Sequence, residues 1–182
     1  MSDLRINDEA KRFLLDVARR SIAEGLGETA QAQSTDDSRE MRADCGIFVT
    51  LKRGGSLRGC IGRIIPTGDI KSMVKELAQA AAFQDPRFYP LESRELGDLE
   101  IEITLIGRLE PIRGPEDIQL GLHGLYIRAP GGSGLLLPQV AIEQGWSAQE
   151  FLGQVCRKAG LPPTAWKMPE SSLFRFEGAA FS

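Results

Sequence analysis

The sequence predicts an α+β fold, a mainly antiparallel sheet with flanking helices. Two pairs of apolar segments, within 47–64 and 124–137, are each joined by a glycine-rich turn, which is typical of β-hairpins. Three other segments repeat their apolar residues at helical spacing. Because helices and hairpins are mixed without regular strand–helix–strand alternation, the pattern favours α+β over a doubly wound parallel sheet.

The first expected element is a helix. Asn7 is a suitable N-cap, and Gly25 and Gly27 are suitable terminators. Its apolar positions recur three or four residues apart, at Phe13, Leu14, Val17, Ala18 and Ile22. The polar segment 28–44 that follows is interpreted as a connection inside one domain spanning 1–182, because a lone helix cannot form a domain.

An antiparallel hairpin is expected next, with strands at 47–52 and 57–64 joined at Gly54-Gly55. A second helix begins after 66–69 and carries one apolar stripe. It ends at Asp85, since the residue before a proline is disfavoured in the helical region. Apolar and polar residues then alternate over 99–107, which predicts a half-buried strand.

The last third of the chain predicts another hairpin, a helix and a strand. The hairpin strands, 124–128 and 135–137, flank a glycine-rich turn over 130–134. Ser147 and Glu150 form a capping-box pattern, which predicts a helix that closes at Gly160. Its apolar face consists of Phe151, Leu152, Val155, Cys156 and Ala159, so Cys156 is expected to be an inert packing residue. A short strand is expected over 173–177.

Composition is that of a globular intracellular protein. The 182 residues are 42% hydrophobic and 26% charged, enough for one core or for one domain with two lobes. The sequence shows no membrane-length apolar run and no signal-peptide pattern, and its three scattered cysteines fit a reducing compartment, so we expect a cytoplasmic protein. The net charge of −3 argues against a protein dedicated to duplex nucleic acid, although a local basic patch stays open.

Residues 57–62, Leu-Arg-Gly-Cys-Ile-Gly, are the most informative in the chain. Side chains alternate along a strand, so Arg58 and Cys60 share one face. A nearby guanidinium favours thiolate over thiol, and Gly59 and Gly62 are of the kind placed where a ligand or another backbone comes close. This indicates an activated thiol in a cleft, with Cys60 and Arg58 as catalytic residues. The alternative is a buried, inert cysteine beside a surface arginine.

The same hexapeptide resembles the signature of the AMMECR-one domain family. Further motifs follow in that family's order at 48–51, 81–88, 99–103, 136–141, 145–146 and 156–161, so the resemblance covers about 14–177. Arg157 and Ile106 depart from the family pattern, and neither lies in the signature. The resemblance implies an α+β fold with a larger lobe, a smaller lobe and a cleft near the signature. It implies no reaction.

Two functional hypotheses follow. Domains that resemble this one often accompany Memo-like and radical-SAM-type proteins, which implies such partners and an enzyme, or enzyme component, acting on a nucleobase or other small moiety. In that case Cys60 contacts an unknown small molecule. The second hypothesis is a non-catalytic binding or scaffold module whose signature is structural. Thiol reactivity would separate the two.

Several other residues are candidates for ligand binding. Asp85 and Arg87 could recognise a ligand as a pair, or could satisfy local backbone and strand groups. Glu102 is a base or a partner for Arg58 if its face lines a cleft, and a solvated residue otherwise. His123, the single histidine, could complete a dyad with Cys60 but is more often a turn residue, and Gln139 could present its amide. We expect no cofactor, and the histidine and cysteine spacing predicts no metal site.

Overall fold

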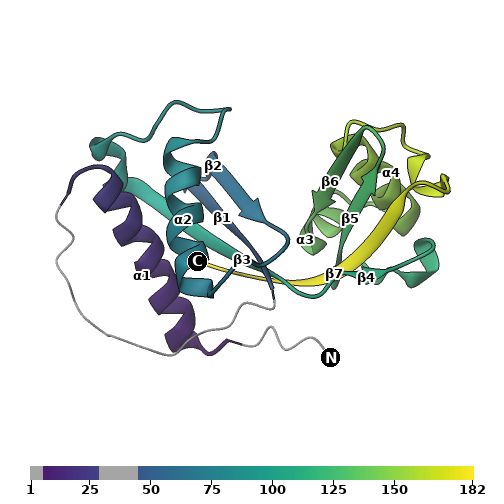
Figure 1. The fold of residues 1–182 in the computed structure, drawn as a ribbon, viewed down its shortest axis with the longest axis horizontal. Coiled ribbons are helices and arrows are strands. Elements are labelled where there is room, and N and C mark those ends of the chain that lie inside the picture. Colours follow the sequence, from purple (N-terminus) through teal and green to yellow (C-terminus); the bar gives the residue numbers. More distant parts are fainter. Residues whose placement is uncertain (1–5, 29–44) are drawn as a thin grey trace. The chain divides into compact units, whose positions relative to one another are not determined.

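The computed structural model describes residues 6–28 and 45–182 (Figure 1). Apart from its first residue, the polar connection expected over 28–44 lies outside the described residues. The chain divides into two compact units, which we call the hairpin unit (3–106 and 179–182) and the C-terminal unit (107–178). Both combine antiparallel strands with helices, which confirms the α+β class. The single domain, its lobes and its cleft stay predictions.

Three strands form the sheet of the hairpin unit in the order β2-β1-β3. Strands β1 (Gly46–Arg53) and β2 (Ser56–Arg63) are antiparallel, as predicted, and β1 pairs antiparallel with β3 (Leu99–Ile106) on its other side. Gly54 and Gly55 both have positive φ, 55° and 76°. A two-residue turn of that kind matches the natural twist of a hairpin. The register set by the turn then shifts by one residue between Leu51 and Lys52, where Arg58 is the extra residue of a β-bulge.

Helices α1 (Asp8–Gly25) and α2 (Ile70–Phe83) pack together against one face of this sheet (Figure 1). The Asn7 side chain accepts a hydrogen bond from the Ala10 amide at 2.8 Å, as expected for the cap of α1. Asp69 caps α2 in the same way, accepting from the Ser72 amide at 2.9 Å. The sheet residues that meet the helices are all apolar and buried: Ile47, Val49, Leu51, Leu99, Ile101, Ile103 and Leu105.

The C-terminal unit is built on β5 (His123–Ala129), which lies between β6 (Gly132–Leu136) and β7 (Ser172–Phe181). The short β4 (Glu110–Pro111) pairs with β7. Helices α3 (Pro138–Glu143) and α4 (Ala148–Lys158) contribute to its core. Short 3-10 helices complete both units, at Ser93–Asp98, Pro115–Asp117 and Ala165–Lys167.

Gly132 and Gly134 of the second hairpin lie in a strand, whereas Gly131 lies in the turn with a φ of 102°. We expected the turn over 130–134, but β6 begins at Gly132. A Cβ on Gly132 would lie 2.1 Å from the Ala159 carbonyl oxygen, and one on Gly134 would lie 2.6 Å from the Ala159 amide nitrogen. These glycines therefore let the end of α4 approach the strand directly.

Candidate functional site

The signature lies on the sheet face opposite α1 and α2. Register places Thr50 opposite Cys60 on one side and opposite Glu102 on the other, so these three residues form a row across β2, β1 and β3. Gly62 follows Cys60 on the same face, because side chains alternate along a strand. Arg58 precedes Cys60 as the extra residue of a β-bulge, since Lys52 pairs with Leu57 and Leu51 with Gly59. We call this surface, with Phe48 and Lys52, the signature face.

Cys60 is half-buried, and its backbone is held from the edge of the sheet. Its amide donates to Asp85 Oδ2 at 2.8 Å, and its carbonyl oxygen accepts from Arg87 Nη2 at 3.2 Å. Since β2 is the edge strand, these two side chains satisfy groups that a neighbouring strand would otherwise bind. The thiol itself lies 3.3 Å from Thr50 Oγ1, at hydrogen-bond distance.

Asp85 and Arg87 form a two-pronged ion pair. Arg87 Nε donates to Oδ1 at 2.9 Å and Nη2 donates to Oδ2 at 2.7 Å. The Asp85 side chain is 2% exposed, and the Arg87 hydrogen bonds hold the pKa of its carboxyl well below the usual range. Arg87 is 50% exposed. Hydrogen bonding to Asp85 raises the pKa of Arg87, with a smaller contribution from Cys60.

The guanidinium of Arg58 is bound by Glu95, a residue that no sequence pattern singles out. Nε donates to Glu95 Oε1 at 2.8 Å and Nη2 donates to Oε2 at 3.0 Å. Both side chains are mostly buried, 17% and 10% exposed. The hydrogen bonds from Arg58 lower the pKa of Glu95 to about 2, while hydrogen bonding to Glu95 raises the pKa of Arg58. The Phe88 ring lies against the guanidinium groups of both Arg58 and Arg87, at 5.9 and 5.6 Å.

Two signature glycines make room for neighbours on opposite faces of β2. A Cβ on Gly59 would lie 2.2 Å from the Ala81 carbonyl oxygen, so this glycine lets α2 contact the strand. A Cβ on Gly62 would lie 2.2 Å from the Phe48 ring, which therefore covers Gly62 on the signature face. Both positions are filled by protein, which gives these glycines a structural reason for being there.

The other candidates divide between the two units. Glu102 forms an ion pair with Lys52 at 2.9 Å rather than with Arg58. His123 and Gln139 belong to the C-terminal unit, at the start of β5 and in the first turn of α3. His123 is buried, its Nδ1 accepts the Gln119 amide at 3.0 Å, and burial lowers its pKa. His123 is therefore bonded to the backbone of a turn, which agrees with the interpretation of this histidine as a turn residue rather than a partner of Cys60.

Sequence reasoning overlooked Thr50 as well as Glu95. The turn at Gly54-Gly55 alone would place Val49 opposite Cys60, but the register shifts by one residue between Leu51 and Lys52, and this irregularity brings Thr50 there instead. Cys156 is fully buried, as expected, and burial raises the pKa of its thiol. Cys45 is also buried.

No group of three or more histidine, cysteine or acidic side chains is placed to hold a metal ion within residues 6–28 and 45–182. None of the described helices has the length and apolar character needed to cross a membrane.

Comparison with known proteins supports the resemblance seen in the sequence. The AMMECR1 family model matches residues 15–181. A protein from Methanothermobacter thermautotrophicus is 40% identical over 177 residues, covering 93% of this chain and 92% of its own length. One from Thermococcus kodakarensis is 38% identical over 188 residues, covering 97% and 92%. The crystal structure of an uncharacterized protein from Pyrococcus horikoshii is similar with a TM-score of 0.86 and 36% identity, covering 96% of this chain and 92% of that one.

Proposed function

The chain belongs to the AMMECR1 family, and from that premise we propose that it is an enzyme or enzyme component whose Cys60 thiol contacts the substrate on the signature face. One observation carries the proposal. The backbone of Cys60 is hydrogen-bonded by Asp85 and Arg87, while its sulfur lies 3.3 Å from Thr50 Oγ1 and also interacts with the Arg87 side chain. A thiol with a fixed backbone and a half-buried position is preorganised to meet a ligand.

The chemistry that this arrangement supports is nucleophilic. The sulfur electron pair would add to the electrophilic carbon of a polarised double bond in the substrate, whose π electrons move to the neighbouring atom as the thiol loses its proton. Thr50 Oγ1, at 3.3 Å, can accept that proton in a relay to solvent. Arg87 supplies positive charge that favours the thiolate. Its half-exposed guanidinium also suits a substrate that carries a carboxylate or phosphate group.

The substrate and partners belong to the same proposal. The family's association with Memo-like and radical-SAM-type proteins supports a nucleobase or other small moiety as the group acted on. Glu102 and its partner Lys52 would lie beside that group, in the same row as Cys60.

Site-resolved alkylation tests the proposal. Native protein is treated with iodoacetamide near neutral pH, and modification at each cysteine is followed by mass spectrometry. Cys60 should react faster than Cys156, which is fully buried. Arg87→Gln should slow the reaction at Cys60 more than Arg58→Leu does, because Arg87 is half exposed and donates to the Cys60 carbonyl oxygen, whereas Arg58 is mostly buried against Glu95. An inert Cys60, or a rate indifferent to both substitutions, would refute the activated thiol.

A second candidate is supported by the ion pairs themselves. Arg58, Asp85, Arg87 and Glu95 all bind one another or the Cys60 backbone, as expected of a scaffold or binding module whose signature is structural. Cys60→Ser separates the candidates, since it preserves shape and removes the nucleophile. Loss of biological function in a fully folded Cys60→Ser protein supports the enzyme, and retained function supports the module.

A further inference from the structure

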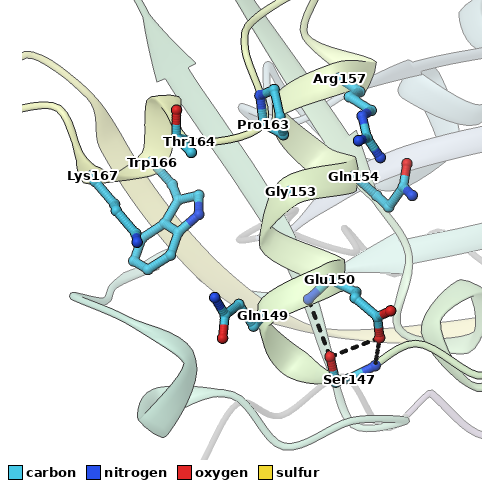
Figure 2. Close-up of a pocket in the computed structure, with 10 residues that line it drawn as sticks. All are labelled: Ser147, Gln149, Glu150, Gly153, Gln154, Arg157, Pro163, Thr164, Trp166 and Lys167. Atoms are coloured by element: carbon cyan, nitrogen blue, oxygen red, sulfur yellow. Dashed lines mark hydrogen bonds between the residues drawn. The ribbon is translucent and has the colours of Figure 1, made fainter.

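The C-terminal unit carries a hollow on the exposed side of α4, away from every residue discussed above as a site. Its volume is about 640 Å³, in the range of small-molecule sites. Figure 2 shows Gly153 of α4 in its middle, with Trp166 and Lys167 at one end and Gln154 and Arg157 at the other. We call it the α4 hollow.

The α4 hollow is lined mainly by hydrogen-bond donors. Arg157 and Lys167 are cations, Trp166 contributes an indole N–H, and Gln149 and Gln154 contribute amides. Figure 2 shows the indole nitrogen on the side of the ring that faces α4. Among the described residues, neither Arg157 nor Lys167 has an acidic partner within ion-pair distance. Lys167 lies over the Trp166 ring at 5.0 Å, which fixes its position without neutralising it.

The one carboxylate in the lining is already engaged. Glu150 Oε2 accepts hydrogen bonds from both the amide and the hydroxyl of Ser147, each at 2.8 Å. Those bonds lower the pKa of Glu150 and complete the cap of α4. The hollow thus offers donors and two uncompensated cations on a protein whose net charge is −3. Its electrostatic complement is an anion rich in acceptor oxygens.

The glycine at position 153 is a second, independent observation that points to a ligand in the α4 hollow. It lies in the middle of α4, its φ is not positive, and a Cβ there would meet only Pro163 Cβ and O at an ordinary 3.7 Å. An alanine would fit, and glycine is the weaker helix former, so packing and backbone geometry give no reason for glycine. Gly153 lines the hollow without a side chain, and Figure 2 shows it between the residues of the two ends.

We propose that the α4 hollow binds a small organic polyanion, whose carboxylate or phosphate groups reach Lys167 and Arg157 across the notch at Gly153. The volume exceeds what a single phosphate ion fills, and the two cations stand at opposite ends. The ligand is therefore an elongated molecule with at least two anionic groups.

The test uses citrate and tripolyphosphate as probes, with acetate and glycerol as controls, on the full ¹⁵N-labelled chain. Both polyanions, or one of them, should shift the Trp166 indole and Gly153 amide resonances saturably, without shifting amides of the hairpin unit. The probe that saturates at lower concentration identifies carboxylate or phosphate as the preferred group. Arg157→Gln and Lys167→Met should each weaken binding by about tenfold.

Lys158→Met is the matched charge control, because Lys158 is an exposed cation of the same helix outside the hollow. Gly153→Leu should abolish binding while leaving the fold intact, since leucine is a good helix former and its Cβ has room. Binding that Lys158→Met weakens as much as Lys167→Met would show a diffuse charge effect and overturn the proposal. Binding that survives Gly153→Leu, or no saturable shift with either probe, would also overturn it.

Discussion

At the scale of single residues, each charged side chain around Cys60 has a near neighbour as its partner. Arg58 binds Glu95, and Arg87 binds Asp85 and the Cys60 carbonyl. The two pairs differ in burial, because Arg58 and Glu95 are both mostly buried whereas Arg87 is half exposed. Arg58 therefore contributes mainly to the structure around the signature, and Arg87 is the cation available to a ligand.

The Arg58–Glu95 pair should be costly to break from one side. Glu95→Gln leaves a mostly buried guanidinium without its counter-charge, and we expect the free energy of unfolding to fall by about 3 kcal/mol. Urea denaturation measures this loss. The double variant Arg58→Met/Glu95→Leu should lose less than the sum of the single variants, because it removes both charges together.

The matched control for Glu95→Gln is Glu76→Gln. Glu76 pairs with Arg63 at 2.7 Å, but its side chain is 58% exposed. An exposed pair of this kind contributes about 0–1 kcal/mol. A cost for Glu95→Gln no larger than that for Glu76→Gln would contradict the structural role given to the buried pair.

At the scale of elements, the contact between β2 and α2 depends on Gly59. The Ala81 carbonyl oxygen occupies the space that a Cβ on residue 59 would need. Because this contact joins the backbones of α2 and β2, no side chain can rotate away to relieve it. We expect Gly59→Ala to lower the free energy of unfolding by about 1–3 kcal/mol, the usual cost of overpacking. Displacement of β2 would also slow alkylation at Cys60.

Gly97 provides the comparison for Gly59. A Cβ there would meet nothing within 4 Å, and its φ is not positive. Gly97→Ala should therefore leave the urea midpoint nearly unchanged. Equal effects of the two substitutions would show that α2 does not constrain β2.

Replacing the glycine in the middle of α4 should stabilise the protein, in contrast to replacing Gly59. Gly153→Ala should raise the free energy of unfolding by about 0.5–1 kcal/mol, because alanine is the better helix former and has room at this position. A melting temperature higher by about 2–4 °C would show this for a chain of this size. A destabilised Gly153→Ala protein would mean that packing, and not a ligand, explains the glycine.

At the scale of the whole molecule, the buried carboxylates couple stability to pH. The pKa of Glu95 is lowered from 4.5 to about 2, and that of Asp85 is lowered as well. A carboxyl with a lowered folded-state pKa stabilises the fold above its unfolded pKa, and that contribution is lost as pH falls through the folded value. Stability should therefore decline from about pH 4.5 downward, by about 3 kcal/mol from Glu95 near pH 2.

Urea unfolding at a series of pH values between neutral and pH 2 checks this decline. Glu95→Gln should be less stable at neutral pH and should lose less on acidification, because glutamine does not titrate. Glu76→Gln should follow the slope of the unmodified protein. A slope in Glu95→Gln equal to that of the unmodified protein would assign acid sensitivity to other groups.

The sequence alone determined the elements and the place of the signature. Local interactions are enough for these features: Asn7 and Ser147 cap helices through residues three positions away, and Gly54-Gly55 forms the turn of the hairpin. The one-residue register shift at Leu51 and Lys52, which leaves Arg58 in a β-bulge, was not predicted from the alternation of side chains. The burial of Cys156 was also predicted from the sequence, because this residue belongs to the apolar stripe of its helix.

Only the tertiary structure decided how those residues are partnered. Glu95 lies 37 positions from Arg58, and Asp85 lies 25 positions from Cys60, so no local pattern links them. The extent of β6 and the helix at Pro138–Glu143 were likewise not predicted, because close contact with α4 sets the first and the second is only six residues long. Contacts between distant segments depend on how the chain packs, and a periodicity of two or 3.6 residues carries no information about them.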